Sequence, residues 1–115
     1  MSNGCIKGSA GKFDGEKLKL SLVPPEIVPA IAEIRHYGTE KYGDPDNWKT
    51  IEPQRYWEAL LRHVLASWED YKAVDPESGM PHLWHIATNA SFILALDKDV
   101  VKTCDKELCD GEDKQ

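Results

Sequence analysis

The stretch that most constrains the fold runs from Trp57 to Asn89, where two helical patterns flank a short turn. The first pattern begins near Pro53 and is expected to run to about Lys72. The second begins at Pro81 and is apolar nearly all round, which places a helix centrally in a fold or at a subunit interface. We therefore expect this helix to lie either centrally in the fold or at a subunit interface, and the chain to form a homo-oligomer. The apolar residues on one broad face of the first pattern are Tyr56, Trp57, Leu60, Leu61, Val64, Trp68 and Tyr71.

The rest of the chain completes an all-α fold, a small bundle of three to four main helices. Residues 17–25 alternate apolar and polar and predict a short extended segment, which ends at two prolines. An earlier helix follows Pro25, and Gly38 interrupts its pattern. We expect a mobile, glycine-rich arm over residues 1–12, a helical domain over 13–98, and an acidic tail over 99–115 with room for one short helix.

Composition restricts the partners. A chain of 115 residues suits one domain, and its net charge of -6 argues against non-specific binding of polymeric nucleic acid, which needs a basic face. No apolar run approaches the ~18 residues of a membrane span, and the N-terminus lacks the apolar core of a signal peptide. Cys5, Cys104 and Cys109 form an odd set without a CxxC pair, which favours free thiols and a cytoplasmic protein.

Three polar residues share one row of the apolar helix, because His82, His85 and Asn89 follow a 3-4 spacing. Polar groups that are buried without a partner cost about 1–3 kcal/mol each. Their partners could be carboxylates, a metal or a ligand, and histidines that serve packing alone remain the alternative. The row is therefore a candidate site.

The other candidates lie on the preceding helix and around Trp48. Glu58, Arg62 and Glu69 fall on the side opposite the apolar face, with His63 on a flank. Taken alone, Glu58 and Arg62 suit an exposed ion pair, and His63 suits a half-buried histidine. An aromatic ring such as Trp48 can stack on a nucleotide base or can cover the core.

Carboxylates and histidines that project from a helical hairpin can hold a divalent cation, which neutralises a polyphosphate and lowers the pKa of an attacking water. Magnesium prefers oxygen ligands. Histidines suit manganese, iron or zinc, or act in proton transfer. The HxxH spacing is a weak metal signal by itself.

The order of the motifs adds a resemblance. KFDGEKLKLSLVPP, GTEKYGDPDNW, YWEALLRHVLASWED, DPESG and HLWHIATNASFILAL together resemble a phage-associated family, the dATP/dGTP diphosphohydrolase N-terminal domain, over about residues 12–97. That family is similar to the MazG-like, all-α nucleotide pyrophosphohydrolases. The resemblance implies an oligomeric helical protein that uses a divalent metal to split a (deoxy)nucleoside triphosphate into monophosphate and pyrophosphate.

The sequence departs from the MazG pattern at the metal ligands. That pattern places ExxE on one helix and ExxD on the next, whereas this chain has His82 and His85 in place of the second pair. Either the metal site is rebuilt from other residues, or the fold binds a nucleotide without cleaving it.

Our first hypothesis is a metal-dependent hydrolase with magnesium or manganese. Its catalytic residues are His63, Glu58 and Glu69, and its metal ligands are Glu69, Asp75, His82 and His85. The substrate-binding residues are Lys41, Tyr42, Asn47, Trp48, Arg55, Arg62 and Asn89. The alternative is a binder without a cofactor that sequesters a nucleotide signal, cyclic or linear, and so counters host defence against phage.

Overall fold

The computed structural model of the protein describes residues 17–97 and 99. Residues 25–98 form one compact unit, and the segment before Pro25 is grouped apart from it. The predictions for the arm (1–12) and for the tail beyond Asp99 lie outside the described residues, as do all three cysteines.

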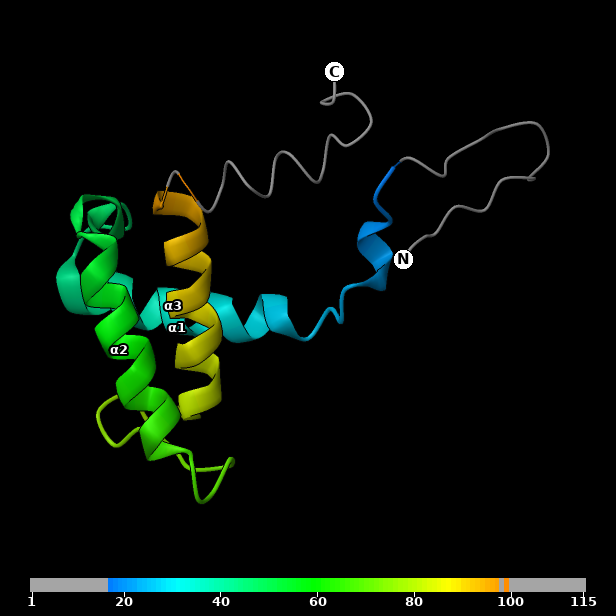
Figure 1. Cartoon of the computed structure of the whole chain (residues 1–115). Coiled ribbons are helices and arrows are strands. Elements are labelled where there is room, and N and C mark those ends of the chain that lie inside the picture. The colour runs from blue at the N-terminus through cyan, green and yellow to red at the C-terminus, as the bar shows by residue number, and fades with distance from the viewer. Residues whose placement is uncertain (1–16, 98, 100–115) are drawn as a thin grey trace. The chain divides into compact units, whose positions relative to one another are not determined.

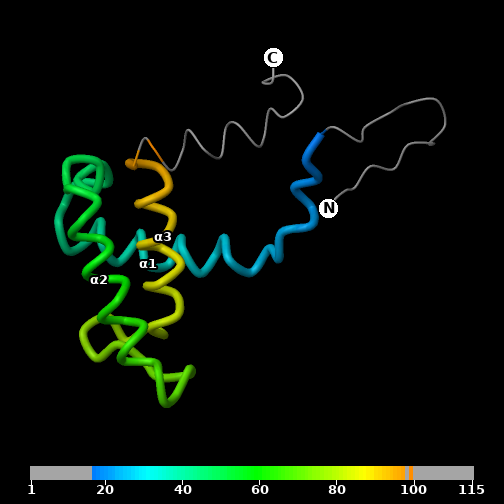
Figure 2. The backbone as a smooth tube through the Cα atoms, viewed as in Figure 1, coloured from blue at the N-terminus to red at the C-terminus, as the bar shows by residue number. Residues whose placement is uncertain are grey.

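Four helical elements make up the compact unit. They are α1 (Ile27–Tyr42), the 3-10 turn η2 (Asn47–Thr50), α2 (Pro53–Ala66) and α3 (His82–Leu96). Within residues 17–97 there is no strand, only an isolated antiparallel bridge between Val74 and Pro81. The all-α prediction is therefore confirmed. Figure 1 shows α2 and α3 side by side and antiparallel, with α1 crossing them, and Figure 2 traces the same path. α3, the apolar helix predicted from Pro81 onward, packs against both α1 and α2. It therefore lies centrally within the unit, which is the first of the two positions expected for it.

The segment before the compact unit differs slightly from its prediction. Leu20–Leu22 form a single 3-10 turn, η1, with extended residues on each side at Lys19 and Val23. The Val23 N–H closes this turn on the carbonyl of Leu20. The alternating pattern therefore predicted extended backbone correctly only at the edges of the turn.

Gly38 does not interrupt α1, contrary to the prediction. The helix continues to Tyr42 and ends at Gly43, whose φ of 75° is left-handed and whose N–H bonds to the Thr39 carbonyl at 2.7 Å. A mid-helix glycine costs about 1 kcal/mol relative to alanine. Here the cost is tolerated because one glycine, four residues before the last residue of the helix, does not outweigh the packing of the helix.

The prediction for the end of the next helix is wrong. α2 begins at Pro53, as expected, but ends at Ala66, well before Lys72. The Ser67 N–H caps the helix on the carbonyls of His63 and Val64. The chain then turns back, and its backbone pairs with the start of α3 (His82 N–H to Ala73 carbonyl, 3.0 Å). This tertiary pairing displaces the helical continuation, so Glu69 and Asp70 lie in the loop.

The centre of the unit is unusually polar. Among the described residues, the buried apolar side chains are Ile34 and Ile93, whereas four polar residues of α3 are buried. The apolar face of α2 is divided, because Trp57 and Leu61 are exposed and Tyr56, Leu60 and Val64 are half-buried. None of the helices in the described part of the chain has the length and apolar character to cross a membrane. The buried polar residues are His82, His85, Thr88 and Asn89.

Candidate functional site

A pocket of about 450 Å³ opens between α1, η2, α2, the loop before α3, and α3 itself. Its lining combines aromatic rings, basic side chains and a group of imidazoles and carboxylates. The volume is within the range of pockets that bind small molecules, about 300–1,000 Å³. The lining residues used below are Tyr37, Gly38, Lys41, Tyr42, Asn47, Trp48, Arg55, Tyr56, Arg62, His63, Asp75, Glu77, His85, Asn89 and Phe92.

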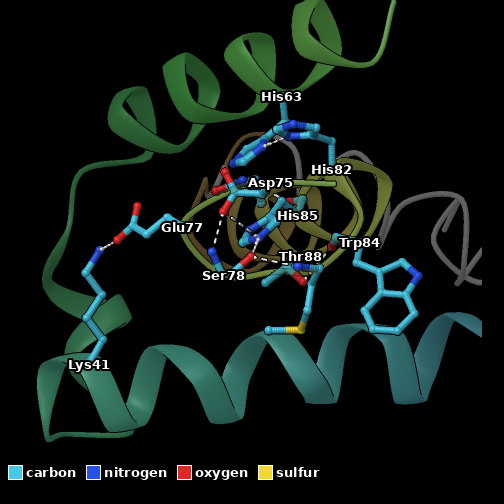
Figure 3. Close-up of polar contacts among 11 residues, drawn as sticks. Lys41, His63, Asp75, Glu77, Ser78, His82, Trp84, His85 and Thr88 are labelled. Atoms are coloured by element: carbon cyan, nitrogen blue, oxygen red, sulfur yellow. Dashed lines mark hydrogen bonds and ion pairs between the residues drawn. The ribbon is translucent and has the colours of Figure 1, made fainter. Parts of the chain in front are cut away.

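Three histidines meet at one end of the pocket (Figure 3). His63 comes from α2, and His82 and His85 come from consecutive turns of α3. The Nδ1 atoms of His63 and His82 are 2.8 Å apart. The His63 ring also stacks on His85, with a centroid distance of 4.4 Å and an interplanar angle of 6°. The antiparallel packing of α2 on α3 thus brings together residues 19 or more positions apart in sequence.

The loop places a carboxylate and a hydroxyl on this cluster. Asp75 Oδ2 accepts a hydrogen bond from the Ser78 N–H at 2.8 Å and lies 3.7 Å from His85 Nε2. Ser78 Oγ lies within hydrogen-bond distance of the same nitrogen, at 2.7 Å. Gly79, at a φ of 75°, allows the tight return, and its N–H bonds to the Asp75 carbonyl at 2.7 Å. The loop therefore holds Asp75 in a fixed position.

Burial sets the charge state of this cluster. Desolvation, reinforced by the neighbouring His85 and His82, lowers the pKa of His63 to about 4. Burial also lowers the pKa of His85, although Asp75 opposes this shift. For Asp75, burial acts to raise the pKa, but the hydrogen bonds from Ser78 and the nearby His85 outweigh it and lower the pKa overall. At neutral pH, His63 and His85 are neutral and Asp75 is ionised.

Three of these groups can serve as metal ligands together. One potential ligand atom each from His63, Asp75 and His82 lies within 4.8 Å of the others. Neutral imidazole nitrogens and a carboxylate oxygen are the donors that divalent transition metals accept. The residues present therefore fit a divalent cation. Asp75 and His82 of the predicted ligands belong to this group, whereas Glu69 and His85 do not, and His63 takes part in their place.

Lys41 reaches from α1 to the rim of this cluster. Its ammonium forms an ion pair with Glu77 of the loop, and Tyr37 also hydrogen-bonds that carboxylate. The hydrogen bond to Glu77 raises the pKa of Lys41 above its usual value, and the same contact lowers the pKa of Glu77. Lys41 is therefore a permanently charged group at the pocket, already paired with a loop carboxylate.

The other end of the pocket is aromatic. The ring of Trp48 stacks on Phe92 with a centroid distance of 4.8 Å and an interplanar angle of 15°. The ring of Tyr56 also lies against Phe92, with a centroid distance of 4.7 Å, and its hydroxyl donates a hydrogen bond to the Trp48 carbonyl at 3.0 Å. The Arg35 guanidinium lies 5.8 Å from the centre of the Trp48 ring. Trp48 thus packs on α3 and also lines the pocket, and its stacking on a base stays a prediction.

The seven predicted substrate-binding residues all line this single pocket, as do His63, Asp75 and His85. His82 contacts His63 next to the lining. Glu58 and Glu69 are not part of the pocket lining. Both are exposed, and the Glu58 carboxylate contacts the Gln54 amide at 3.5 Å. The roles of all these residues remain predictions. Ser78 and Thr88 were not anticipated, because a loop serine and a mid-helix threonine carry no signal in the sequence. The predicted substrate-binding residues are Lys41, Tyr42, Asn47, Trp48, Arg55, Arg62 and Asn89.

Comparison with models of protein families gives a match. The family model described as "dATP/dGTP diphosphohydrolase, N-terminal" matches residues 7–106. Neither a curated protein nor a solved structure matches significantly. Because the family match covers most of the 115 residues, the chain belongs to the dATP/dGTP diphosphohydrolase N-terminal domain family.

Proposed function

We propose that this protein binds a purine (deoxy)nucleoside triphosphate in the pocket and hydrolyses it to monophosphate and pyrophosphate with the help of a divalent cation. The family name supports nucleotide hydrolysis. The observation that carries the proposal is that one pocket contains aromatic rings at one end, basic side chains along its wall and the histidine cluster at the other end. A nucleoside triphosphate carries a flat base at one end and charged phosphates at the other, and the pocket offers groups that suit each of them.

The base binds at the aromatic end. Trp48 offers a ring that is fixed by its stack on Phe92, and aromatic faces suit a flat heterocycle. Asn47, next to it, carries an amide that can donate and accept hydrogen bonds along the edge of a base. Asn89 lies deeper: its amide nitrogen bonds to the His85 carbonyl at 2.9 Å. Its amide oxygen accepts no hydrogen bond from the described residues, so it can accept one from the ligand.

The phosphates bind along the basic wall. Among residues 17–97, neither Arg55 nor Arg62 forms an ion pair, and both line the pocket. A guanidinium can hold a phosphate with two parallel hydrogen bonds. Lys41 would join them once its contact with Glu77 opens. This arrangement gives an acidic protein a local positive wall.

The cation would be held by His63, Asp75 and His82. When bound, a divalent cation neutralises phosphate charge and favours attack at phosphorus. In the reaction, water attacks the α-phosphorus, the bond to the bridging oxygen breaks, and pyrophosphate leaves with the electron pair. His85 is neutral at pH 7 and can accept the proton of the water, while Ser78 and Asp75 hold its ring.

Turnover measurements test this proposal. The protein is incubated with dATP or dGTP and Mg²⁺ or Mn²⁺, and the products are separated by ion-exchange chromatography. We expect monophosphate and pyrophosphate in equal amounts. His85→Ala should lower kcat by at least ~100-fold, which is typical for loss of a general base. His36→Ala is the matched control, because His36 is exposed on α1 and outside the pocket, and it should leave kcat unchanged.

A non-catalytic nucleotide binder, which in a phage setting would sequester a linear or cyclic signal, is the second candidate. The observation that favours it is the position of Glu58 and Glu69, which leaves the described pocket without the paired helical carboxylates of the MazG pattern. No turnover with any cation, together with a nucleotide-dependent rise in Tm, would support the binder and contradict hydrolysis.

A further inference from the structure

The histidine cluster carries an inference about the chemical class of the cation. We infer that the group His63, Asp75 and His82 selects a transition-metal dication such as Mn²⁺, Co²⁺ or Zn²⁺ over Mg²⁺. This inference shares its residues with the proposed function but does not require hydrolysis. It is carried by the donor atoms, by their fixed geometry, and by the engagement of the other carboxylates nearby.

The donor set consists of two imidazole nitrogens and one carboxylate oxygen. Mg²⁺ demands oxygen donors in near-octahedral geometry, whereas imidazole suits Zn, Cu, Fe and Ni. The Nδ1 atoms of His63 and His82 face each other at 2.8 Å, so one of them must donate a proton to the lone pair of the other. A cation that replaces this shared hydrogen bond gains two nitrogen donors at once.

The ring of His63 is already oriented for such a role. It is stacked against His85 at 4.4 Å and contacts His82 at a centroid distance of 5.0 Å. His82 and His85 are both buried side chains of α3. Because the rings are held by packing, little further ordering is needed when a cation binds.

The other carboxylates cannot convert the group into an oxygen site. Glu77 is engaged by Lys41 and Tyr37. Glu58 and Glu69 lie outside the pocket. Asp75 remains, and its Oδ2 is held by the Ser78 N–H, while its Oδ1 has no hydrogen bond within the described residues. The site therefore offers one free carboxylate oxygen beside two nitrogens.

Metal binding without nucleotide tests this inference. The metal-free protein is titrated with Co²⁺, followed by the visible absorption of nitrogen-ligated cobalt, and with Mn²⁺, Zn²⁺ and Mg²⁺ by calorimetry. We expect one Co²⁺ or Zn²⁺ per chain, with a Kd at least 100-fold below that for Mg²⁺. His82→Gln and Asp75→Asn should each weaken Co²⁺ binding at least tenfold, with the fold checked by circular dichroism. His36→Ala should bind like wild type.

Equal or tighter binding of Mg²⁺, or loss of Co²⁺ binding in His36→Ala alone, would overturn the inference. Tight Co²⁺ binding without turnover of dATP or dGTP would support the site and contradict hydrolysis. Turnover with Mg²⁺ in a protein that does not bind Co²⁺ would support hydrolysis and contradict the transition-metal site.

A separate observation carries a second inference. Four large apolar side chains on α2 and just beyond its C-cap Ser67 form an exposed stripe: Trp57 (45% exposed), Leu61 (51%), Leu65 (70%) and Trp68 (75%). From these residues we infer that α2 pairs antiparallel with α2 of a second copy of this chain. The order Trp-Leu-Leu-Trp at intervals of four, four and three residues is nearly symmetric, so each Trp would meet the other Trp and each Leu the other Leu. A two-fold interface requires such self-complementarity.

The size of the stripe agrees with a dimer. Covering these side chains in two copies removes on the order of 1,000 Å² from water, which reaches the lower limit for a specific interface. Two buried apolar residues in the described unit form a small core, so a second copy also supplies missing apolar burial.

Light scattering after gel filtration tests this pairing. We expect the wild type at twice the 13.0 kDa of one chain, and Leu61→Glu/Leu65→Glu at the monomer mass. Leu22→Glu, at a residue 75% exposed outside the compact unit, should remain dimeric. A monomeric wild type at micromolar concentration, or a double variant that stays dimeric, would overturn the inference.

Discussion

Glu77 is the residue at which nucleotide binding should be easiest to strengthen. Its carboxylate forms an ion pair with Lys41. In the proposed function, the Lys41 ammonium binds a phosphate of the nucleotide instead. Both side chains are exposed to solvent, and solvent screening keeps such ion pairs weak. Glu77→Gln should therefore lower the Kd for dATP or dGTP, by up to about fivefold, as measured by calorimetry. Glu40→Gln, beside Lys41 on α1 and exposed, should have no such effect. Weaker binding in Glu77→Gln would show that the carboxylate helps the ligand.

The buried histidines predict how stability depends on pH. In the unfolded chain a histidine titrates near 6.5, whereas burial lowers the pKa of His63 to about 4 and lowers that of His85 as well. Between these values the unfolded chain binds protons that the folded chain does not, so stability falls as the pH drops through this window. The pKa of Asp75 is lowered in the folded protein, so its ionised carboxylate stabilises the fold at pH values above its unfolded pKa, near 3.9. This stabilisation is lost only when the pH falls below that value.

Thermal unfolding of the metal-free protein at pH 7.5 and pH 5 measures this effect. Each kcal/mol lost lowers Tm by roughly 4–8 °C in a domain of this size. His63→Asn should reduce the difference between the two pH values. Stability that stays constant or rises toward pH 5 would mean that the histidines are not buried as described.

At the scale of elements, one glycine within α1 and one at its C-cap have opposite requirements. Gly38 is helical and a Cβ there meets nothing within 4 Å, whereas Gly43 has a φ of +75° that other residues rarely adopt. Gly38→Ala should stabilise the fold by about 0.5–1 kcal/mol. Gly43→Ala should destabilise it by about 1 kcal/mol. Denaturant titration distinguishes the two, and destabilisation by Gly38→Ala would indicate that α1 breaks at that residue.

Helix positions followed from the sequence where local signals agreed. Pro53 and Pro81 mark the starts of α2 and α3 correctly, and the 3-4 spacing of His82, His85 and Asn89 predicted one row of side chains. The end of α2 was missed because it depends on the pairing of Ala73 with His82, a contact between distant residues. Glu69 was misplaced for the same reason.

At the scale of the whole molecule, the pocket could be predicted only in part. The substrate-binding residues were chosen for their chemistry, and the fold brings them into one lining. The contact of His63 with His82 depends on how α2 rotates against α3, which periodicity does not determine. The position of Asp75 depends on the hydrogen bonds that shape the loop. The kinds of side chain that line the pocket could therefore be predicted from the sequence, whereas the distances between them follow only from the packing of the helices and the loop.

The central claim is that one pocket holds a nucleotide with a cation at His63, Asp75 and His82. Crystals grown with Mn²⁺ and a dGTP analogue that carries a methylene group between the α- and β-phosphorus test it most directly, through the anomalous signal of manganese. We predict one manganese peak between these three side chains and the base on Trp48. A manganese peak away from the three side chains, or an analogue bound outside the pocket, would contradict the account.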